Sequence, residues 1–253
     1  MVAAFGYLAE RKVAATAVST ITPGPFHTPA LAQMVLPEDV SEPRWFDGRG
    51  SLIVPNGDEA LLVFSGFAPL PAALEPYLAT AVLQDTLPLR PDDADRPIWV
   101  YRAAASEMVA AWQTWLTPQQ AQFGEAAKLV GFDLSSDGVV AGDSVQLVTV
   151  WQLQAAVAPD LRLFTHVLGP DGNPLAQADR LDAPSNRWVA GDWLVQLHEM
   201  LIPADTAVGE YPLTIGLYHC LDTACAQTER LTVWQDETAV GDHLPLTQLE
   251  VIE

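Results

Sequence analysis

The sequence predicts an α+β protein, in which a small α/β subdomain precedes an all-β, immunoglobulin-like two-sheet sandwich. Strand-like and helix-like segments alternate up to residue 103, which is typical of a small α/β layer. From residue 123 onward, eight short apolar runs follow one another, separated by turn signals, as in a sandwich. We therefore expect an α/β subdomain over 1–103, a helical linker over 104–122 and the sandwich over 123–253.

Composition agrees with this size and limits the partners. The chain has 253 residues, of which 49% are hydrophobic, enough for two cores. Only 17% of the residues are charged, which excludes a disordered solvating chain. The formal net charge is −20, and such a surface repels phosphate backbones, so we expect no nucleic-acid partner.

Two kinds of segment define the first region. The segment 28–36 can begin with Thr28 as the N-cap and Pro29 at the first helical position, which suits a short helix. The runs at 51–55 and 60–66 are almost wholly apolar, as in strands buried on both faces of a sheet. The full prediction for this region is strands at 12–21, 51–55, 60–66 and 96–103, and helices at 28–36 and 70–80.

Residues 104–122 are rich in alanine and predict a helix that runs into a linker. Trp112 and Trp115 lie three residues apart, on one helical face. We expect these two side chains to dock the helix onto a domain rather than to bind a ligand.

The last region predicts strands at 128–135, 144–154, 161–169, 173–180, 193–202, 211–219, 229–234 and 244–252. Asp171 and Gly172 form the centre of a hairpin turn. The segment "VAGD" occurs twice directly before a strand, and its glycines can adopt positive φ at no steric cost. Tyr211 follows the turn "DTAVGE" and is our candidate for a tyrosine corner, whose hydroxyl bonds back to nearby backbone.

Six residues are candidates for substrate binding. Arg44, Trp45, Asp47 and Arg49 lie in "RWFDGRGSLIVP" and could form the rim of a substrate site, or a turn with an Arg–Asp pair that leads into a strand. Trp188 and Trp193 flank a turn and could stack on sugar rings. Equally, they could cover a sheet edge or fill the end of the core.

Two further groups could bind a metal or form a covalent link. Asp92, Asp93 and Asp95 are close together in "PDDADRP", and hard cations prefer such oxygen ligands, although a solvated acidic loop explains the same pattern. Cys220 and Cys225 could form a small-loop disulfide, as in an oxidising compartment, or remain two thiols. No pattern for a nucleotide or other organic cofactor is present, so we expect none.

No segment predicts a membrane span. The longest uncharged run, Val13 to Pro37, contains four prolines and is not predominantly apolar. The apolar part of the first 24 residues is too short and too polar for a good signal peptide.

Two long stretches resemble a known family. "VAATAVSTITPGPFHTPALAQMVLPEDVSEPRWFDGRGSLIVP" resembles part of the extracytoplasmic region of multi-spanning bacterial glycosyltransferases, the ArnT-like and protein-mannosyltransferase-like enzymes that use polyprenyl-phosphate sugars. The segments "LFTHVLGPDGNPLAQADR" and "RWVAGDWLVQLHEMLIPADTAVGEYPLTIGLY" are similar to the β-sandwich at the C-terminus of the same proteins.

The resemblance implies a non-catalytic accessory region on the extracytoplasmic face of the cell membrane. Its partner would be the transmembrane glycosyltransferase region, in the same polypeptide or complex, and its ligand a carbohydrate or lipid-linked sugar. Met1 would then be internal to a longer protein, and no catalytic residue carries over. Two alternatives stay open: a free-standing carbohydrate-binding or surface-adhesion protein, and a soluble hydrolase with a carboxylate or metal site.

Overall fold

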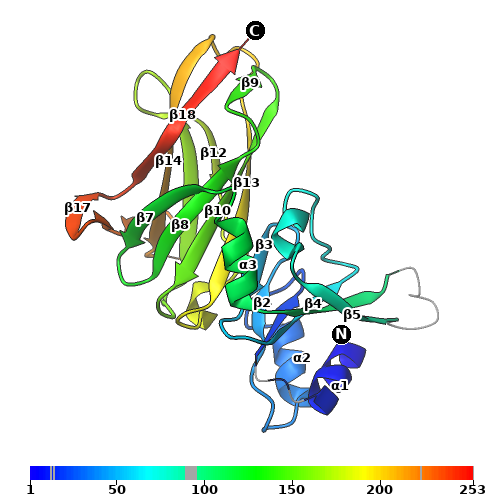
Figure 1. Ribbon diagram of the computed structural model, residues 1–253. Helices are drawn as coiled ribbons and strands as arrows, with labels where there is room; N and C mark the ends of the chain where they lie inside the picture. The colour runs from blue at the N-terminus through cyan, green and yellow to red at the C-terminus, as the bar shows by residue number, and fades with distance from the viewer. Residues whose placement is uncertain (12, 14, 89–95, 223, 253) are drawn as a thin grey trace.

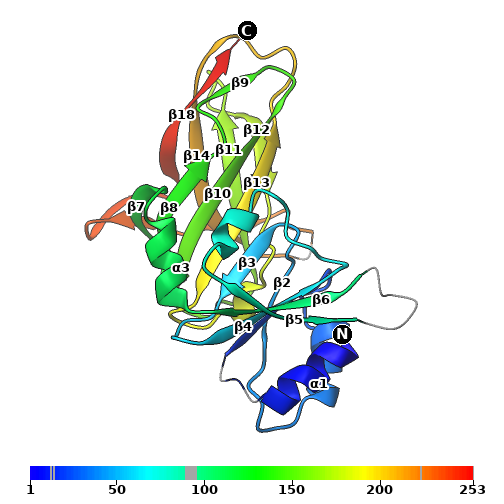
Figure 2. The same ribbon diagram turned by 45° about the vertical axis from the view of Figure 1, so that its right-hand side comes forward.

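The computed structural model describes residues 1–253 except 12, 14, 89–95, 223 and 253. It contains one mixed sheet with two helices at the N-terminal end and two larger sheets that lead to the C-terminus (Figures 1 and 2). The fold is therefore mostly β-structure, as predicted. In the described chain, no helix has the length and apolarity needed to cross a membrane.

The first sheet has the strand order β2-β1-β4-β6-β5, with β1 parallel to both β2 and β4. Helices α1 and α2 cover one face, where Phe5 and Leu8 pack with Val18, Trp45 and Val63. The helix α1 was not predicted, because this segment was considered only as a signal peptide. The elements are α1 (Val2–Arg11), β1 (Thr16–Ser19), α2 (Thr28–Val35), β2 (Arg44–Phe46), β4 (Ala60–Ser65), β5 (Val82–Leu87) and β6 (Ile98–Ala103).

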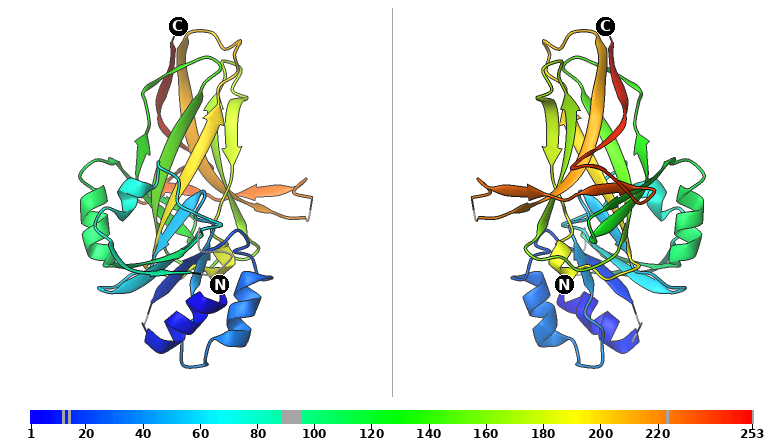
Figure 3. Two further views of the ribbon diagram at one scale, coloured as in Figure 1. Left: turned by 90° about the vertical axis from the view of Figure 1, so that its right-hand side faces the viewer. Right: turned by 90° about the vertical axis from the view of Figure 1, so that its left-hand side faces the viewer.

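The remaining strands form a two-sheet sandwich, seen from two sides in Figure 3. One sheet has the order β17-β16-β7-β8-β10-β13-β3 and the other β12-β11-β14-β18-β9, with β15 paired to β14. Their bounds are β3 (Ser51–Val54), β7 (Thr117–Phe123), β8 (Ala127–Leu134), β9 (Gly138–Val140), β10 (Ser144–Leu153), β11 (Leu161–Leu168), β12 (Pro174–Asp179), β13 (Trp193–Leu201), β14 (Gly209–Cys220), β15 (Thr228–Arg230), β16 (Val233–Gln235), β17 (Thr238–Gly241) and β18 (Leu244–Ile252).

The turn and corner predictions for the sandwich are confirmed, whereas the predicted strand 229–234 divides into β15 and β16, which pair with β14 and β7. The Tyr211 hydroxyl donates a hydrogen bond to the Ala207 carbonyl at 2.8 Å, which is the predicted corner. Gly172 has φ 78° at the centre of the β11–β12 hairpin. Gly142 and Gly191, in the two "VAGD" segments, have φ 96° and 88°. Backbone constraints on these turns were therefore readable from residue type alone.

Strand β3 differs from the expectation that residues 51–55 belong to the α/β sheet. It pairs antiparallel with β13, so that Trp193 faces Val54 and Gln196 faces Ser51. All four residues of β3 are buried, because both faces of the strand are covered. The first region and the sandwich thus share a sheet.

Residues 70–80 and 104–122 also differ from expectation. Only a 3-10 turn, η1 (Glu75–Leu78), forms in the first segment, because Pro76 lacks the N–H that a longer helix needs. In the second, helix α3 (Ala105–Trp112) is followed by β7, so that the expected linker ends inside the sandwich. Trp112 docks α3 as predicted, because it is 1% exposed and its Nε1–H donates to the Tyr77 carbonyl at 3.1 Å.

A buried ion pair fastens the two regions together. Arg44, at the start of β2, donates from Nε to Asp192 Oδ2 at 2.9 Å. The side chains are 16% and 2% exposed. Asp192 Oδ1 also accepts the backbone N–H of Asn56 at 2.8 Å. Asp192, directly before β13, therefore binds one residue that precedes β3 in the chain and one that follows it.

Removing one partner of this pair should be costly. Arg44→Ala leaves the Asp192 carboxylate buried without its cation, and we expect the free energy of unfolding to fall by about 3–5 kcal/mol. Urea denaturation measures this. The control is Arg187→Ala, since Arg187 pairs with Glu42, whose side chain is 55% exposed, and we expect a loss under about 1 kcal/mol. Equal losses in the two variants would contradict the role of the Arg44 pair.

His198 occupies the space between the two sandwich sheets. It is 1% exposed, and its Nε2 and Nδ1 lie 3.0 Å and 3.1 Å from the hydroxyls of Thr149 and Thr165. Burial lowers the pKa of His198 to about 3. The imidazole is therefore neutral in the folded protein throughout the physiological pH range and serves as a polar bridge between the sheets.

Acid should destabilise the fold through this residue. Between pH 6.5 and about pH 3 the unfolded chain binds a proton at His198 that the folded chain does not, so stability falls as the pH is lowered through this window. The slope is up to about 1.4 kcal/mol per pH unit. Urea midpoints measured from pH 7 to pH 4 should fall less steeply in His198→Gln. An unchanged slope would show that His198 does not titrate on unfolding.

Candidate functional site

The turn after β2 is a structural junction. Asp47 pairs with Arg49 at 2.6 Å, and its backbone N–H donates to the Asp182 carbonyl at 2.8 Å. Gln196 on β13 donates to the Gly50 carbonyl at 2.9 Å and to Asp182 Oδ2 at 2.8 Å. A Cβ on Gly50 would lie 2.1 Å from Asp182 Oδ2, so a larger residue here would displace the carboxylate that Gln196 binds. The turn therefore fixes β3 against β13.

Three of the four predicted substrate contacts in this segment are largely buried. Trp45 is 1% exposed and packs edge-on against Phe5, with ring centroids 6.2 Å apart, so it belongs to the core under α1. The guanidinium of Arg44 is paired with the buried carboxylate of Asp192, and the Arg44 side chain is itself largely buried. Asp47 is buried as well, whereas the Arg49 side chain is 52% exposed. Of the four residues, only Arg49 can meet a ligand directly.

The two candidate tryptophans of the sandwich have different surroundings. Trp188 is 4% exposed, and its Nε1–H donates to the Ala183 carbonyl at 3.1 Å, so it fills the end of the core. Trp193 is half-buried and lines an open hollow. The turn between them contains Asp192, and the ion pair with Arg44 thus determines where β13, and with it Trp193, begins.

The remaining predicted groups contribute no site that we can describe. Asp92, Asp93 and Asp95 lie outside the described residues. Within the described part of the chain, no group of three or more His, Cys, Asp or Glu side chains could hold a metal ion. Cys220 and Cys225 form a disulfide with a Cα–Cα distance of 4.7 Å, in the connection between β14 and β15.

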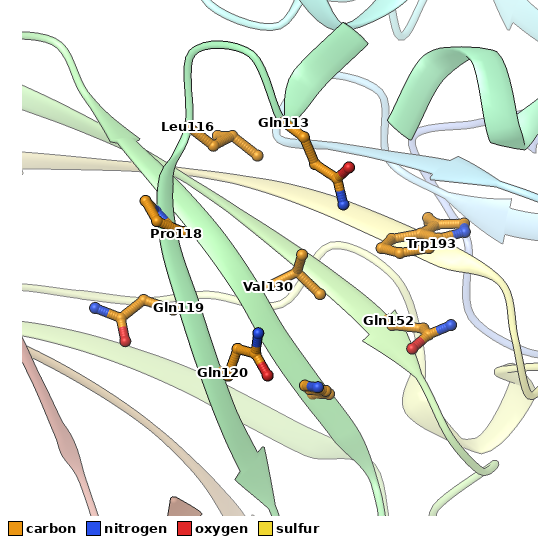
Figure 4. Close-up of a pocket in the computed structure, with 9 residues that line it drawn as sticks. Gln113, Leu116, Pro118, Gln119, Gln120, Val130, Gln152 and Trp193 are labelled. Carbon is orange, nitrogen blue, oxygen red and sulfur yellow. The ribbon is translucent and has the colours of Figure 1, made fainter. Parts of the chain in front are cut away.

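The hollow beside Trp193 is the candidate site. It has a volume of about 420 Å³ and lies on the outer face of the larger sandwich sheet, next to the C-terminal end of α3 (Figure 4). Five of its nine lining side chains are polar, and the apolar ones include one indole. The lining residues are Gln113, Leu116, Pro118, Gln119, Gln120, Lys128, Val130, Gln152 and Trp193.

Strand register aligns the main groups in one row. Trp193 faces Gln152 across β13 and β10, Gln152 faces Lys128 across β10 and β8, and Lys128 faces Gln122 across β8 and β7. Residues directly opposite one another project from the same face of a sheet. The row is therefore a continuous outward-facing line of side chains across four strands.

The opposite face of the same strands holds the row in place. Phe123 and Trp151 alternate with Gln122 and Gln152, are buried, and pack edge-on with ring centroids 5.0 Å apart. Because side chains alternate along a strand, burying these aromatics obliges their polar neighbours to face outward. The packing of these aromatic side chains in the core therefore also determines which polar side chains line the site.

A β-bulge adds a second glutamine to the hollow. Pro118 pairs with Gly131 and Ala121 with Leu129, so β7 carries one more residue than β8 between these pairs. The extra residue lets both Gln119 and Gln120 line the hollow opposite Val130. Bulges are a common means of redirecting a side chain at a site.

The electrostatics of the hollow contrast with the rest of the chain. Lys128 is one of only two lysines in a chain of net charge −20, and no described acidic side chain pairs with it within 4.0 Å. The lining residues named above include no carboxylate, histidine, hydroxyl or thiol, and the hollow therefore contains Lys128 as its one titratable side chain. Its chemistry is that of hydrogen bonding and stacking.

These glutamines were not among the residues predicted from the sequence. The segments "AQF" and "WQL" contain a pattern that predicts them, because glutamine there alternates with apolar residues that face the core. The bulge carries no comparable signal, because it depends on the pairing of β7 with β8. Gln113, the residue directly after α3, precedes Gln152 by 39 residues in the chain, and only the tertiary fold brings the two together.

A second, smaller hollow of about 230 Å³ lies on the other sheet. There the Asp179 carboxylate lies 3.3 Å from both His166 Nε2 and the Tyr218 hydroxyl. Arg230 stacks over Phe164, with its guanidinium carbon 4.5 Å from the ring centroid. The lining residues there satisfy one another, and we assign no reaction to them.

The comparisons with known proteins leave the family open. No family model matches the chain, and no curated protein matches it. Among solved structures, the crystal structure of Spo0M, the sporulation control protein from Bacillus subtilis, is similar over 50% of this chain and 49% of that chain, at 20% identity and a TM-score of 0.19. The match spans about half of Spo0M, and a TM-score this low supports no argument about fold or function.

Proposed function

We propose that this chain is a non-catalytic carbohydrate-binding region that serves a membrane glycosyltransferase from the extracytoplasmic side. The observation that carries the binding function is the outward row of Trp193, Gln152, Lys128 and Gln122. The membrane assignment is supported by the resemblance of both halves of the sequence to such enzymes. No step of sugar transfer is assigned to residues of this chain.

The row matches the chemistry of a sugar. A sugar hydroxyl both donates and accepts hydrogen bonds, and each glutamine amide offers two donor hydrogens and a carbonyl acceptor. The face of an indole ring is electronegative, so it attracts the C–H groups on the face of a pyranose. Amides alongside one half-buried indole therefore fit a polyhydroxylated ring better than an apolar ligand, which would leave the amides unsatisfied.

The opposite end of the molecule supports a location against a membrane protein. Helices α1 and α2 lie at the end away from the C-terminus (Figures 1 and 2). Residues 13–37 contain no Asp, Glu, Lys or Arg, although the chain has 32 acidic residues. Large apolar side chains are exposed there, a feature that marks interaction sites. This apolar pole comprises Val2, Ile21, Phe26, Leu31, Met34 and Val35, which are 36–84% exposed.

We also assign the sandwich to the immunoglobulin-like type. Support comes from the hydrogen bond of Tyr211 to Ala207, four residues earlier in the chain, at the entry to β14. The packing of two mainly antiparallel sheets with Trp151 in the core between them is consistent with this type. A free-standing carbohydrate-binding protein with the same groove is the second candidate, and the apolar pole distinguishes the two.

Sugar binding should depend on Trp193. We expect Trp193→Ala to weaken binding of oligosaccharides at least about tenfold, which corresponds to about 1.4 kcal/mol of lost stacking. Glycan-array screening followed by calorimetry on the best ligand provides the measurement.

Two matched controls accompany this variant. Trp115→Ala removes an indole that is 40% exposed outside the hollow. Gln152→Ala should weaken binding as well, and its control is Gln146→Ala, because Gln146 lies on the same strand about 20 Å away. Binding that survives Trp193→Ala, or that falls equally in the controls, would refute the site.

The apolar pole should bind lipid. We expect the chain to float with vesicles of zwitterionic phospholipid and the double variant Phe26→Ser/Met34→Ser to lose this association. The stability should hardly change, since these side chains are 74% and 84% exposed. The control is Leu201→Ser/Val208→Ser, at exposures of 64% and 61% on the sandwich. Equal flotation of all three proteins would argue for the free-standing alternative.

A further inference from the structure

The hollow beside Trp193 is the middle of a longer groove. A hollow of about 480 Å³ shares Gln120 and Lys128 with it and reaches Trp234. On the other side, a hollow of about 310 Å³ shares Gln113 and Trp193 with it. The three hollows therefore form one trough over β16, β7, β8, β10 and β13.

The strand register extends the row to the far end of this trough. Trp234 on β16 faces Gln122 on β7. It therefore extends the row by one strand beyond Gln122, which itself faces Lys128. Trp234 is 42% exposed, so its ring is available to a ligand. Four inter-strand spacings separate the two tryptophans, which places their backbones about 19 Å apart. A single monosaccharide cannot reach both.

The far end is closed by an unusual turn. Gln235 pairs with Thr238, so only Asp236 and Glu237 connect β16 to β17. Both have positive φ, 46° and 63°, as a two-residue hairpin turn requires. Glycine or asparagine is preferred at such positions, and glutamate is unfavourable there. The turn holds two carboxylates at the end of the trough, where they line the hollow with Trp234.

We infer that this groove binds an extended, neutral oligosaccharide that lies across the strands and stacks on both Trp193 and Trp234. The inference rests on the proposed function and specifies the class of sugar. Between the two rings, Gln152, Lys128 and Gln122 meet the hydroxyls of the intervening residues. The carboxylates of the turn accept hydrogen bonds from hydroxyls and repel anionic sugars, as does the net charge of −20.

The length of the ligand provides the test. Linear neutral oligosaccharides of one to six residues, in β-1,4-linked glucose, α-1,4-linked glucose and β-1,4-linked N-acetylglucosamine series, would be titrated into the full chain by calorimetry. In the series that binds, we expect affinity to rise at least about tenfold between the disaccharide and the longest member, equivalent to about 1.4 kcal/mol. Trp234→Ala should remove this gain.

Two further variants separate stacking from folding. Trp234→Phe should restore most of the length dependence, because it keeps an aromatic face, and Trp115→Ala should leave the length dependence intact. Short sugars that bind through Trp193 without any gain from length would overturn this inference and leave the proposed function standing. The absence of binding by every series would overturn both. Stronger binding of acidic glycans than of neutral ones of equal length would overturn the neutral specificity.

Discussion

The ion pair between Arg44 and Asp192 joins two regions that the chain order keeps apart. Arg44 begins a strand of the α/β sheet, and Asp192 lies directly before the sandwich strand that carries Trp193. Both charges are largely buried, so each depends on the other for its compensation. Together with the hydrogen bonds of Gln196 to Gly50 and Asp182, this pair holds β3 against β13, directly beside Trp193.

The sandwich was largely predictable because its information is local. Short apolar runs between turn signals identified seven strands, β8, β10, β11, β12, β13, β14 and β18, and turn chemistry identified the β11–β12 hairpin and the Tyr211 corner. The short edge strands β9 and β17 escaped, since three or four residues carry too little pattern. Strand β3 was recognised as a strand and placed in the neighbouring sheet, because a fully apolar strand does not specify which sheet will bury it.

The candidate site was predictable only in part. Trp45, Trp188 and Trp193 all lie beside charged or turn residues in the sequence, yet only Trp193 lines a hollow. The three tryptophans differ in whether another element of the fold covers the ring. Helix α1 covers Trp45, for example, and such coverage depends on the tertiary fold. The glutamines were missed for the opposite reason. An amide on a strand usually means ordinary solvent exposure, and only their alignment across strands distinguishes these.

The pairing of β3 with β13 has a consequence for synthesis. Gly50 and Gln196, which meet through a hydrogen bond, are 146 residues apart in the chain. At ordinary rates of translation the ribosome needs roughly 7–30 s to cover that distance. During this interval "SLIV" is a nascent apolar strand with an unfilled edge, the kind of segment that self-associates. Strand β3 therefore lacks its sandwich partner until β13 emerges.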